Sequence, residues 1–315
     1  MLQATLSTRT LGCEYELAVP IIGAGGGTEV QETIANILNQ NGIRACSRNY
    51  SHAPVPNNID IVVEQDHSIV GEQRFQGVRW AQVEVKTRIL NGLADWEQIV
   101  PKTLDILRYC GGRITPSCGH HIHLGFTEFK DDPTQVRSLW NLIHRFEQVI
   151  YGLVAPSRRG NQYCRPLPPA AKHLHGANSR RTIKNRLSRF DRYFGLNLVH
   201  IWDDVPRIEL RYGSGTLETD KARHWAQFCS RLVDHACLRT CQAAPASLSN
   251  DRKGLERMLV SIGLKVNSKV YSVVAPELRE TGKFTLKRWK NFNGDISLRK
   301  FDVEQKAEIS RDNPT

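Results

Sequence analysis

The stretch PSCGHHIHLGF places a cysteine and three histidines within residues 118–123. If the stretch is a β-strand, His121 and His123 point to one face and His120 points to the other, because side chains alternate along a strand. Two histidines separated by one residue are typical of zinc sites, but a catalytic zinc needs a third protein ligand. The alternative is a pair of histidines that are satisfied within the sheet.

Glutamates on two other predicted strands supply candidate ligands. Glu14 and Glu16 lie two residues apart in LGCEYELAVP, so a strand there aims both carboxylates in one direction. Glu84 lies in WAQVEVKT, on the face that also carries Lys86. Neighbouring acids repel one another, and a divalent cation offsets that cost. Oxygen-rich ligands favour Mg²⁺ or Mn²⁺ over zinc. Solvated outer faces of these strands are the ordinary alternative.

A fourth glutamate lies between two arginines. Arg207, Glu209 and Arg211 share one face of the predicted strand PRIELRYG. This arrangement suits a metal ion on Glu209 and phosphate oxygens on the two guanidinium groups. The alternative is an exposed ladder of ion pairs.

Hydrophobic periodicity and turn residues predict the elements that carry these groups. We expect one α+β domain with a mainly antiparallel sheet. Thr28 and Asp95 are the predicted caps of the first two helices, and Pro101 is expected to interrupt the second. The chain beyond residue 264 reads as basic and irregular. The predicted strands span residues 11–20, 43–50, 58–70, 79–88, 119–127, 193–202 and 206–213, and the predicted helices 28–40, 95–109, 132–154, 179–189, 219–242 and 251–264.

Composition indicates a soluble globular protein. Hydrophobic residues make up 40% and charged residues 24% of the 315 residues. The sequence has no stretch that suits a signal peptide or a membrane span, so we expect a cytoplasmic protein without membrane contact. The eight cysteines are scattered and form no CxxC pair, which favours reduced thiols and argues against a closed zinc site.

The formal net charge is +11, and the excess is concentrated. Residues 158–192 contain ten lysines and arginines and a single acid, Asp191. A solvated basic surface is one interpretation, and an acidic substrate or a nucleic acid is another. The stretch lacks the signatures of RNA-binding and helix-turn-helix modules, so phosphate or carboxylate is favoured over a nucleic acid strand.

The order of these signals resembles the amidoligase family of the glutamine synthetase superfamily, whose members are carboxylate–amine ligases. GCEYEL resembles the family's opening G-x-E-x-E, and DHSIV resembles its D-x-S segment. EVKTRILNG resembles E-[IV]-[VI]-S-P-x-L-x-G, and CGHHIHLG resembles C-G-x-H-V-H-x-G. APSRR, YFGLNL and RIELRYGSGTLE resemble P-x-S-R, Y-x-x-L-N-L and E-F-R-x-x-x-G-T-L-D. The likeness runs from about residue 11 to about residue 265.

The resemblance implies a glutamine synthetase-like fold: a curved antiparallel β half-barrel with helices packed on its outer side. It also implies ATP and two divalent ions, Mg²⁺ or Mn²⁺, in the trough. By motif match, Glu16 and Glu84 would hold one ion, and Glu14, His121 and Glu209 would hold the other. The resembling domain spans residues 1–265, which leaves residues 266–315 as a basic extension of unassigned role.

The same motifs imply the residues that bind and activate the nucleotide. His123, Arg207 and Arg211 would lie at the phosphates, and Arg158 and Asn197 match positions on the active-site side. Lys86, Thr87 and Arg88 replace the family's Ser-Pro after the central glutamate, which puts an extra cation beside the site.

The implied activity is an ATP-dependent amide synthesis through an acyl phosphate. The substrates would be a small-molecule or peptide carboxylate and an amine, one of them acidic. Asp66, in the D-x-S segment, is the candidate base for the amine. Two other classes stay open: a phosphotransferase of related half-barrel fold, and a nucleic-acid-binding protein that uses residues 158–192. The sequence leaves the oligomeric state open.

Overall fold

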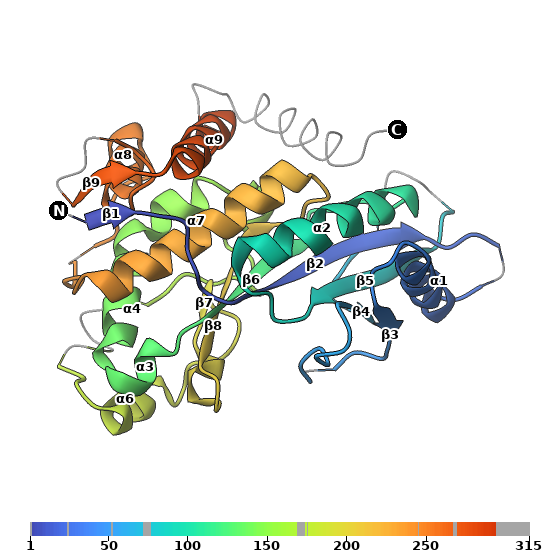
Figure 1. Cartoon of the computed structure of the whole chain (residues 1–315), viewed down its shortest axis with the longest axis horizontal. Coiled ribbons are helices and arrows are strands. Elements are labelled where there is room, and N and C mark those ends of the chain that lie inside the picture. Colours follow the sequence, from blue (N-terminus) through green and yellow to red (C-terminus); the bar gives the residue numbers. More distant parts are fainter. Residues whose placement is uncertain are drawn as a thin grey trace. The chain divides into compact units, whose positions relative to one another are not determined.

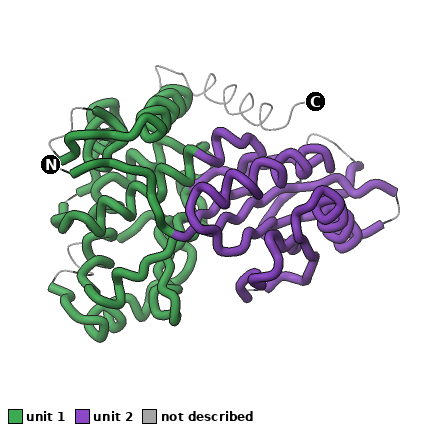
Figure 2. Tube along the Cα trace, viewed as in Figure 1, with its two compact units in different colours: residues 1–9, 123–212, 224–301 green, residues 10–122, 213–223, 302–315 purple. Residues whose placement is uncertain are grey.

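The computed structural model describes residues 2–293, except residues 24, 52, 72–76, 169–173, 175, 245 and 267–269. Figure 1 shows a mixed α+β protein. The described residues divide into two compact units, which Figure 2 distinguishes by colour. Unit 1 contains the described residues of 1–9, 123–212 and 224–301, and unit 2 contains those of 10–122 and 213–223.

Unit 2 is built on a sheet with the strand order β3-β4-β5-β2-β6. The central pairs β2–β5 and β4–β5 are antiparallel, and the pair β3–β4 is parallel. The bounds are β2 Leu11–Pro20, β3 Ala45–Ser47, β4 Ile61–Gln65, β5 Trp80–Thr87 and β6 Gly119–Gly125, whose last three residues belong to unit 1.

One face of this sheet is apolar and is covered by two helices. Tyr15 and Leu17 of β2 lie opposite Val85 and Val83 of β5, and all four side chains are almost fully buried. Helix α1 (Gly27–Gln40) contacts β3, β4, β5 and helix α2 (Gly92–Tyr109). The polar residues of the same strands therefore share the opposite face.

Unit 1 is mainly helical. Strand β8 (Arg207–Ser214) pairs antiparallel with β7 (Leu196–Asn197), and β1 (Leu2–Ala4) pairs parallel with β9 (Tyr271–Val274). Helix α4 is tied to the end of helix α7, because Ser138 donates its hydroxyl to the carbonyl of Ala236 at 2.7 Å. The helices are α3 Glu128–Asp131, α4 Thr134–Tyr151, α6 Arg180–Leu187, α7 Thr219–Leu238, α8 Arg252–Ser261 and α9 Pro276–Asn293; the first residues of α7 belong to unit 2.

The mixed α+β class and the mainly antiparallel pairing of the sheet are confirmed. The curvature of a half-barrel and the domain bounds 1–265 and 266–315 stay predictions. Residues 294–315 of the expected extension lie outside the described residues. The eight cysteines, all of them among the described residues, form no disulfide. Among the described residues, no helix combines the length and hydropathy that a membrane crossing requires.

Several predicted element boundaries are wrong. Helix α1 begins after Gly26 rather than at a Thr28 cap, and α2 begins after Asn91 and continues through Pro101. Asp95 instead accepts a hydrogen bond from the Asn91 backbone N–H at 2.9 Å. The predicted strand 193–202 shrinks to β7, because the Asn197 side chain accepts from the Val199 N–H and the chain turns into a 3₁₀ helix.

The described residues beyond 264 are not irregular. They form β9 and the 18-residue helix α9. The start of the chain also forms a strand, β1, which no sequence pattern had indicated. Strands β1 and β9 pair with one another although they lie far apart in the sequence. The Ser272 hydroxyl donates to the carbonyl of Leu2, which lies 270 residues earlier in the chain.

Candidate functional site

Three adjacent strands of unit 2 bring two glutamates and a histidine together. Glu16 on β2 lies directly opposite Glu84 on β5, and His121 lies on β6, the other neighbour of β2. One ligand atom from each of these residues lies within 4.8 Å of the others. All three side chains are buried, with exposed fractions of 5%, 4% and 1%. Two carboxylates and an imidazole in this arrangement are a ligand set for a divalent cation.

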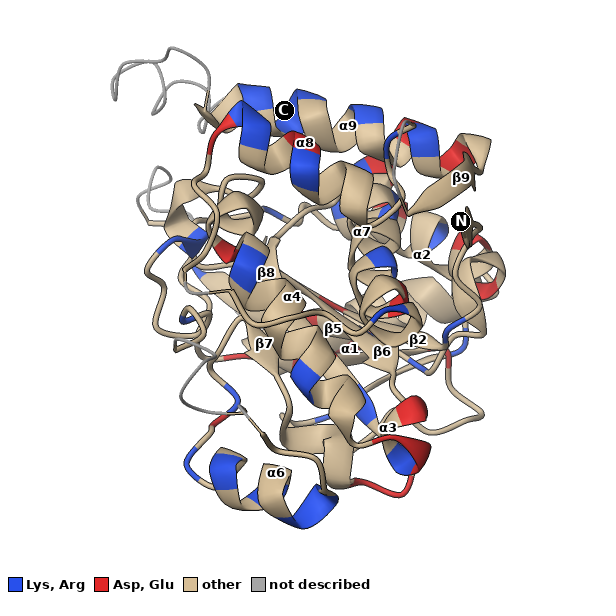
Figure 3. Cartoon of the chain, turned by 90° about the vertical axis from the view of Figure 1, so that its left-hand side faces the viewer, with Lys and Arg blue, Asp and Glu red and all other residues tan. Residues whose placement is uncertain are grey.

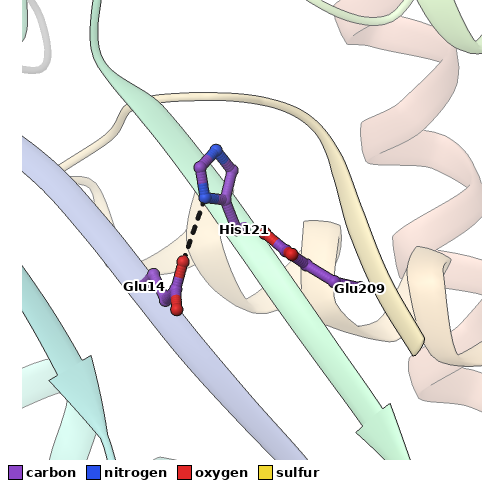
Figure 4. Close-up of side chains that lie close together, drawn as sticks. All are labelled: Glu14, His121 and Glu209. Atoms are coloured by element: carbon purple, nitrogen blue, oxygen red, sulfur yellow. Dashed lines mark hydrogen bonds and ion pairs between the residues drawn. The ribbon is translucent and has the colours of Figure 1, made fainter. Parts of the chain in front are cut away.

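Glu14 adds a further carboxylate to the histidine. Its Oε2 atom lies 3.1 Å from His121 Nδ1 (Figure 4). The Oε1 atom of Glu16 lies 3.4 Å from His121 Nε2. The imidazole therefore has a carboxylate at each ring nitrogen. Glu16 is also fixed by the backbone N–H of Gly119, which donates to its Oε2 at 2.6 Å. Glu209, also drawn in Figure 4, belongs to unit 1, and its role as a ligand stays a prediction.

The electrostatics of this group favour a bound cation. Burial raises the pKa of Glu84 well above its ordinary value, and the charges of Glu14 and Glu16 raise it further, while Lys86 opposes the rise. The cost of ionising Glu84 would be offset by a divalent ion, because an opposite charge at contact distance favours the ionised form. The residues present therefore fit the divalent metal that the family resemblance implies.

His120 shows which histidine is structural. Its ring stacks on the ring of Tyr15, with 4.5 Å between the centroids, on the apolar face of the sheet. The alternation predicted from the sequence is therefore confirmed: His120 packs in the core, and His121 reaches the acidic face.

Unit 1 carries the arginines and the remaining glutamate on β8. Ile208, Leu210 and Tyr212 are almost fully buried, and the alternate residues form the other face. On that face Glu209 is 3% exposed and accepts a hydrogen bond from Asn197 Nδ2 at 2.7 Å and one from Arg211 Nη1. Asn197 thus orients the Glu209 carboxylate.

The two arginines of β8 differ in their partners. Arg207 donates to Asp203 at 2.7 Å and lies 3.0 Å from His200 Nδ1, and neither partner belongs to the predicted ladder of Arg207, Glu209 and Arg211. Arg211 donates its Nε to the Tyr163 carbonyl at 3.1 Å. Loop residues of unit 1 therefore hold the Arg211 side chain in place.

Arg158 is a fully buried guanidinium, with an exposed fraction of 1%. It donates to the backbone carbonyl of Arg211 at 2.7 Å, so it supports the strand that carries Arg211. His123 is the first residue of β6 that belongs to unit 1. Burial and the charge of Arg207 lower the pKa of His200, and His123 contributes a smaller lowering effect.

Asp66 lies in the turn after β4, where it accepts a hydrogen bond from the Ser68 N–H at 2.8 Å. Among the described residues, it does not belong to a group of ligand atoms that could hold a metal. Its role as a base stays a prediction.

Sequence reasoning missed Glu64. This residue lies on β4 directly opposite Glu84, and its side chain is fully buried. The only signal was its place in the predicted strand NIDIVVEQDHSIV, where it follows three apolar residues.

Comparison with known proteins supports one family. Residues 7–233 match the family model described as "Putative amidoligase enzyme". A comparison with curated proteins finds no match. Among solved structures, the chain is similar to a chain in the crystal structure of the complex between the prokaryotic ubiquitin-like protein Pup and its ligase PafA. The TM-score is 0.40 and the sequence identity is 10%.

That similarity covers 96% of this chain and 66% of the matched chain, so the present chain spans just under two thirds of that protein's length. The family match extends over most of the sequence and includes the strands that carry Glu14, Glu84, His121 and Glu209. The chain therefore belongs to the amidoligase family.

Proposed function

We propose that this enzyme is an ATP-dependent carboxylate–amine ligase that uses two divalent metal ions. The observation that carries the proposal is the buried group of Glu16, Glu84 and His121, with Glu14 at the second ring nitrogen, in a chain of the amidoligase family. A buried acidic group of this kind is costly without cations, and phosphoryl transfer from ATP requires them.

The proposed ligand sets follow the motifs of the family. Glu16 and Glu84 would hold one ion, and Glu14, His121 and Glu209 would hold the other. Bound divalent ions would neutralise the charge that develops on the phosphates of ATP. Asn197 would keep the Glu209 carboxylate oriented, as its 2.7 Å hydrogen bond to Oε2 supports.

The arginines of β8 would act on the transferred phosphoryl group. Arg207, Arg211 and His123 would bind the phosphate oxygens, and Arg158 would support Arg211 from behind. An oxygen of the substrate carboxylate attacks the γ-phosphorus, the bond from that phosphorus to the bridging oxygen breaks, and ADP leaves. The amine nitrogen then attacks the acyl carbon, the carbon–oxygen bond to phosphate breaks, and the nitrogen loses a proton, for which we propose Asp66 as the acceptor.

Helix α6 supports an acidic substrate. It contains Arg180, Arg181, Lys184 and Arg186 and no acid (Figure 3). Its buried residues are Ile183 and Leu187. Two arginines in its first turn oppose the helix dipole, so helix stability does not account for this charge pattern. We propose that the exposed basic face of α6 attracts the acidic substrate.

The first test is thermal unfolding with and without Mg-ATP, in the wild type and in Glu16→Gln. Ligand at about 100 times its dissociation constant adds roughly 2.7 kcal/mol to the free energy of unfolding. For a chain of this size, a melting shift of several degrees is expected. The shift should need Mg²⁺ and should be lost in the variant; equal shifts in both proteins would contradict the proposed ligands.

Product analysis separates the ligase from the phosphotransferase. A ligase releases free phosphate only when both a carboxylate and an amine are present, and it forms an amide. A phosphotransferase leaves a stable phosphorylated acceptor and needs a single co-substrate. Candidate carboxylates and amines are screened by phosphate release, and acidic peptides come first because of α6.

A further inference from the structure

The acidic face of unit 2 holds a row of three glutamates, one more than the metal group uses. Glu64 on β4, Glu84 on β5 and Glu16 on β2 are directly opposite one another in the sheet register. Their exposed fractions are 0%, 4% and 5%. Like charges directly opposite each other destabilise a sheet, so the row needs a compensating cation even before a metal binds.

Lys86 is that cation. It follows Glu84 by two residues on the same face of β5 and lies opposite Glu14 in the register. Its Nζ atom forms ion pairs with Glu84 Oε2 at 2.8 Å and with Glu64 Oε2 at 2.9 Å. The side chain is only 13% exposed. One ammonium group therefore joins a proposed metal ligand to an acid that lies outside the ligand group.

The Glu64 side of this link is fixed independently of any metal. Glu64 also pairs with Arg48 and accepts from the Ser51 N–H at 3.3 Å. Lys86 in turn donates to the Ser51 carbonyl at 3.3 Å and lies 5.1 Å from the centroid of the Tyr50 ring. These contacts hold the ammonium beside Glu84 from the far side, so it cannot move away freely when a metal ion arrives.

We propose that Lys86 is a fixed internal counter-ion that lowers the affinity of the Glu16–Glu84–His121 group for a divalent ion, and that Glu64 shares its charge with Glu84. The inference rests on the proposed metal group. Without a metal, Lys86 compensates the Glu84 carboxylate and stabilises the acidic face. With a metal on Glu84, the same ammonium lies one carboxylate away from the ion and repels it, and the buried setting screens this repulsion poorly.

The test is Mn²⁺ binding to the full-length protein without nucleotide. Binding is measured by calorimetry and by the loss of the electron paramagnetic resonance signal of free Mn²⁺. Lys86→Met removes the charge and keeps most of the stem, and it should tighten Mn²⁺ binding at least tenfold. Lys86→Arg keeps the charge and should stay within about threefold of the wild type. Lys283→Met, which breaks an exposed pair with Glu280 on α9, is the remote control and should change nothing.

Glu64→Gln gives the decisive contrast. It breaks the same ion pair but leaves Lys86 charged and paired with Glu84 alone, so Mn²⁺ binding should weaken. A merely structural ion pair would move both variants in the same direction. Tightening in Lys86→Met together with weakening in Glu64→Gln supports the proposal, and unchanged or weaker binding in Lys86→Met overturns it.

Two further variants keep the result decisive. If Lys86→Met does not fold, the double variant Glu64→Gln/Lys86→Met removes an acid and a base together, and it should still bind Mn²⁺ more tightly than the wild type; equal or weaker binding overturns the inference. His121→Asn identifies the site. If no protein shows Mn²⁺ binding that depends on His121, the proposed metal group is refuted. If binding depends on His121 but is the same with and without the Lys86 charge, only the counter-ion role of Lys86 is refuted.

Discussion

At the scale of single residues, two adjacent histidines have opposite environments. His121 lies between the carboxylates of Glu14 and Glu16, while His120 stacks on Tyr15 on the other face of the sheet. We predict that His121→Asn abolishes the melting shift caused by Mg-ATP. His120→Asn should lower the melting temperature, because a buried ring is lost, but should keep the shift. Thermal unfolding of both variants checks this, and loss of the shift in both would remove the distinction.

Glu147 on α4 is a buried acid that the proposed chemistry does not use. Its Oε1 atom accepts from the Tyr212 hydroxyl at 2.6 Å and from the Leu167 N–H at 2.9 Å. Burial raises the pKa of Glu147 from 4.5 to about 7, and the two hydrogen bonds only partly oppose the rise. The carboxyl group thus ties a loop and β8 to the helix.

The raised pKa predicts a pH dependence of stability. Between pH 4.5 and about 7 the folded protein binds more protons at Glu147 than the unfolded chain does. The free energy of unfolding therefore falls by on the order of 3 kcal/mol as pH rises through this window, and it levels off above the window. Urea unfolding at pH 5 and pH 7.5 should show this loss in the wild type relative to Glu147→Gln. Parallel pH profiles of the two proteins would contradict it.

The sequence predicted the individual ligands better than their surroundings. Alternation along β2, β5 and β6 placed Glu14, Glu16, Glu84 and His121 on one face, as observed. Glu64 escaped because a lone acid in an apolar strand gives no hint that it lies opposite Glu84. That relation depends on the β4–β5 register, which joins residues about twenty positions apart in the chain.

At the scale of elements, Gly195 shows why β7 and β8 can pair closely. A Cβ atom at this position would lie 2.1 Å from the Tyr212 ring, which is itself almost fully buried. We predict that Gly195→Ala lowers the free energy of unfolding by about 1–3 kcal/mol, because the ring has no room to move.

A matched glycine provides the control. A Cβ atom at Gly27, the first residue of α1, meets only the Ala81 Cβ atom at 3.9 Å, which is an ordinary contact distance. Because alanine is the better helix former, Gly27→Ala should not lower the free energy of unfolding. Denaturant unfolding of the two alanine variants compares them directly. Equal stabilities would show that the Tyr212 ring adapts without cost.

Periodicity succeeded where apolar residues mark the buried face. In α4, part of the predicted helix 132–154, the apolar residues at helical spacing are buried throughout: Val136, Leu139, Trp140, Ile143, Phe146 and Ile150. It failed for α9, whose buried face includes Thr281, Gly282 and Thr285, so that polar and small residues hide the helical repeat. Strands β1 and β9 are three and four residues long, which is too short for an alternating pattern to be recognised in the sequence.

At the scale of the whole molecule, the functional motifs are divided between two units. Glu14, Glu16, Glu84 and His121 belong to unit 2, and Arg207, Glu209 and Arg211 belong to unit 1. Motif order gave the family but could not give this division, because the chain passes from one unit to the other within β6 and again within β8. The proposed ligase chemistry needs residues of both units.

Glu209→Gln tests that requirement. The variant keeps the size of the side chain and one oxygen that can accept a hydrogen bond. It removes the negative charge that the second ion would need. We predict that the melting shift caused by Mg-ATP is lost, and that Mn²⁺ still binds to Glu16, Glu84 and His121, because this group lies wholly in unit 2. Calorimetry with Mn²⁺ alone and thermal unfolding with Mg-ATP separate the two effects.

The matched control is Glu256→Gln on α8, an exposed acid of unit 1 that pairs with Arg252 and Lys265. It should leave both measurements unchanged, since exposed pairs contribute little. If Glu209→Gln behaves like this control, Glu209 is not a ligand, and the nucleotide-linked metal must be held by unit 2 alone. If it loses Mn²⁺ binding as well, the two ions are not independent, and Glu209 supports the whole acidic group rather than a single ion.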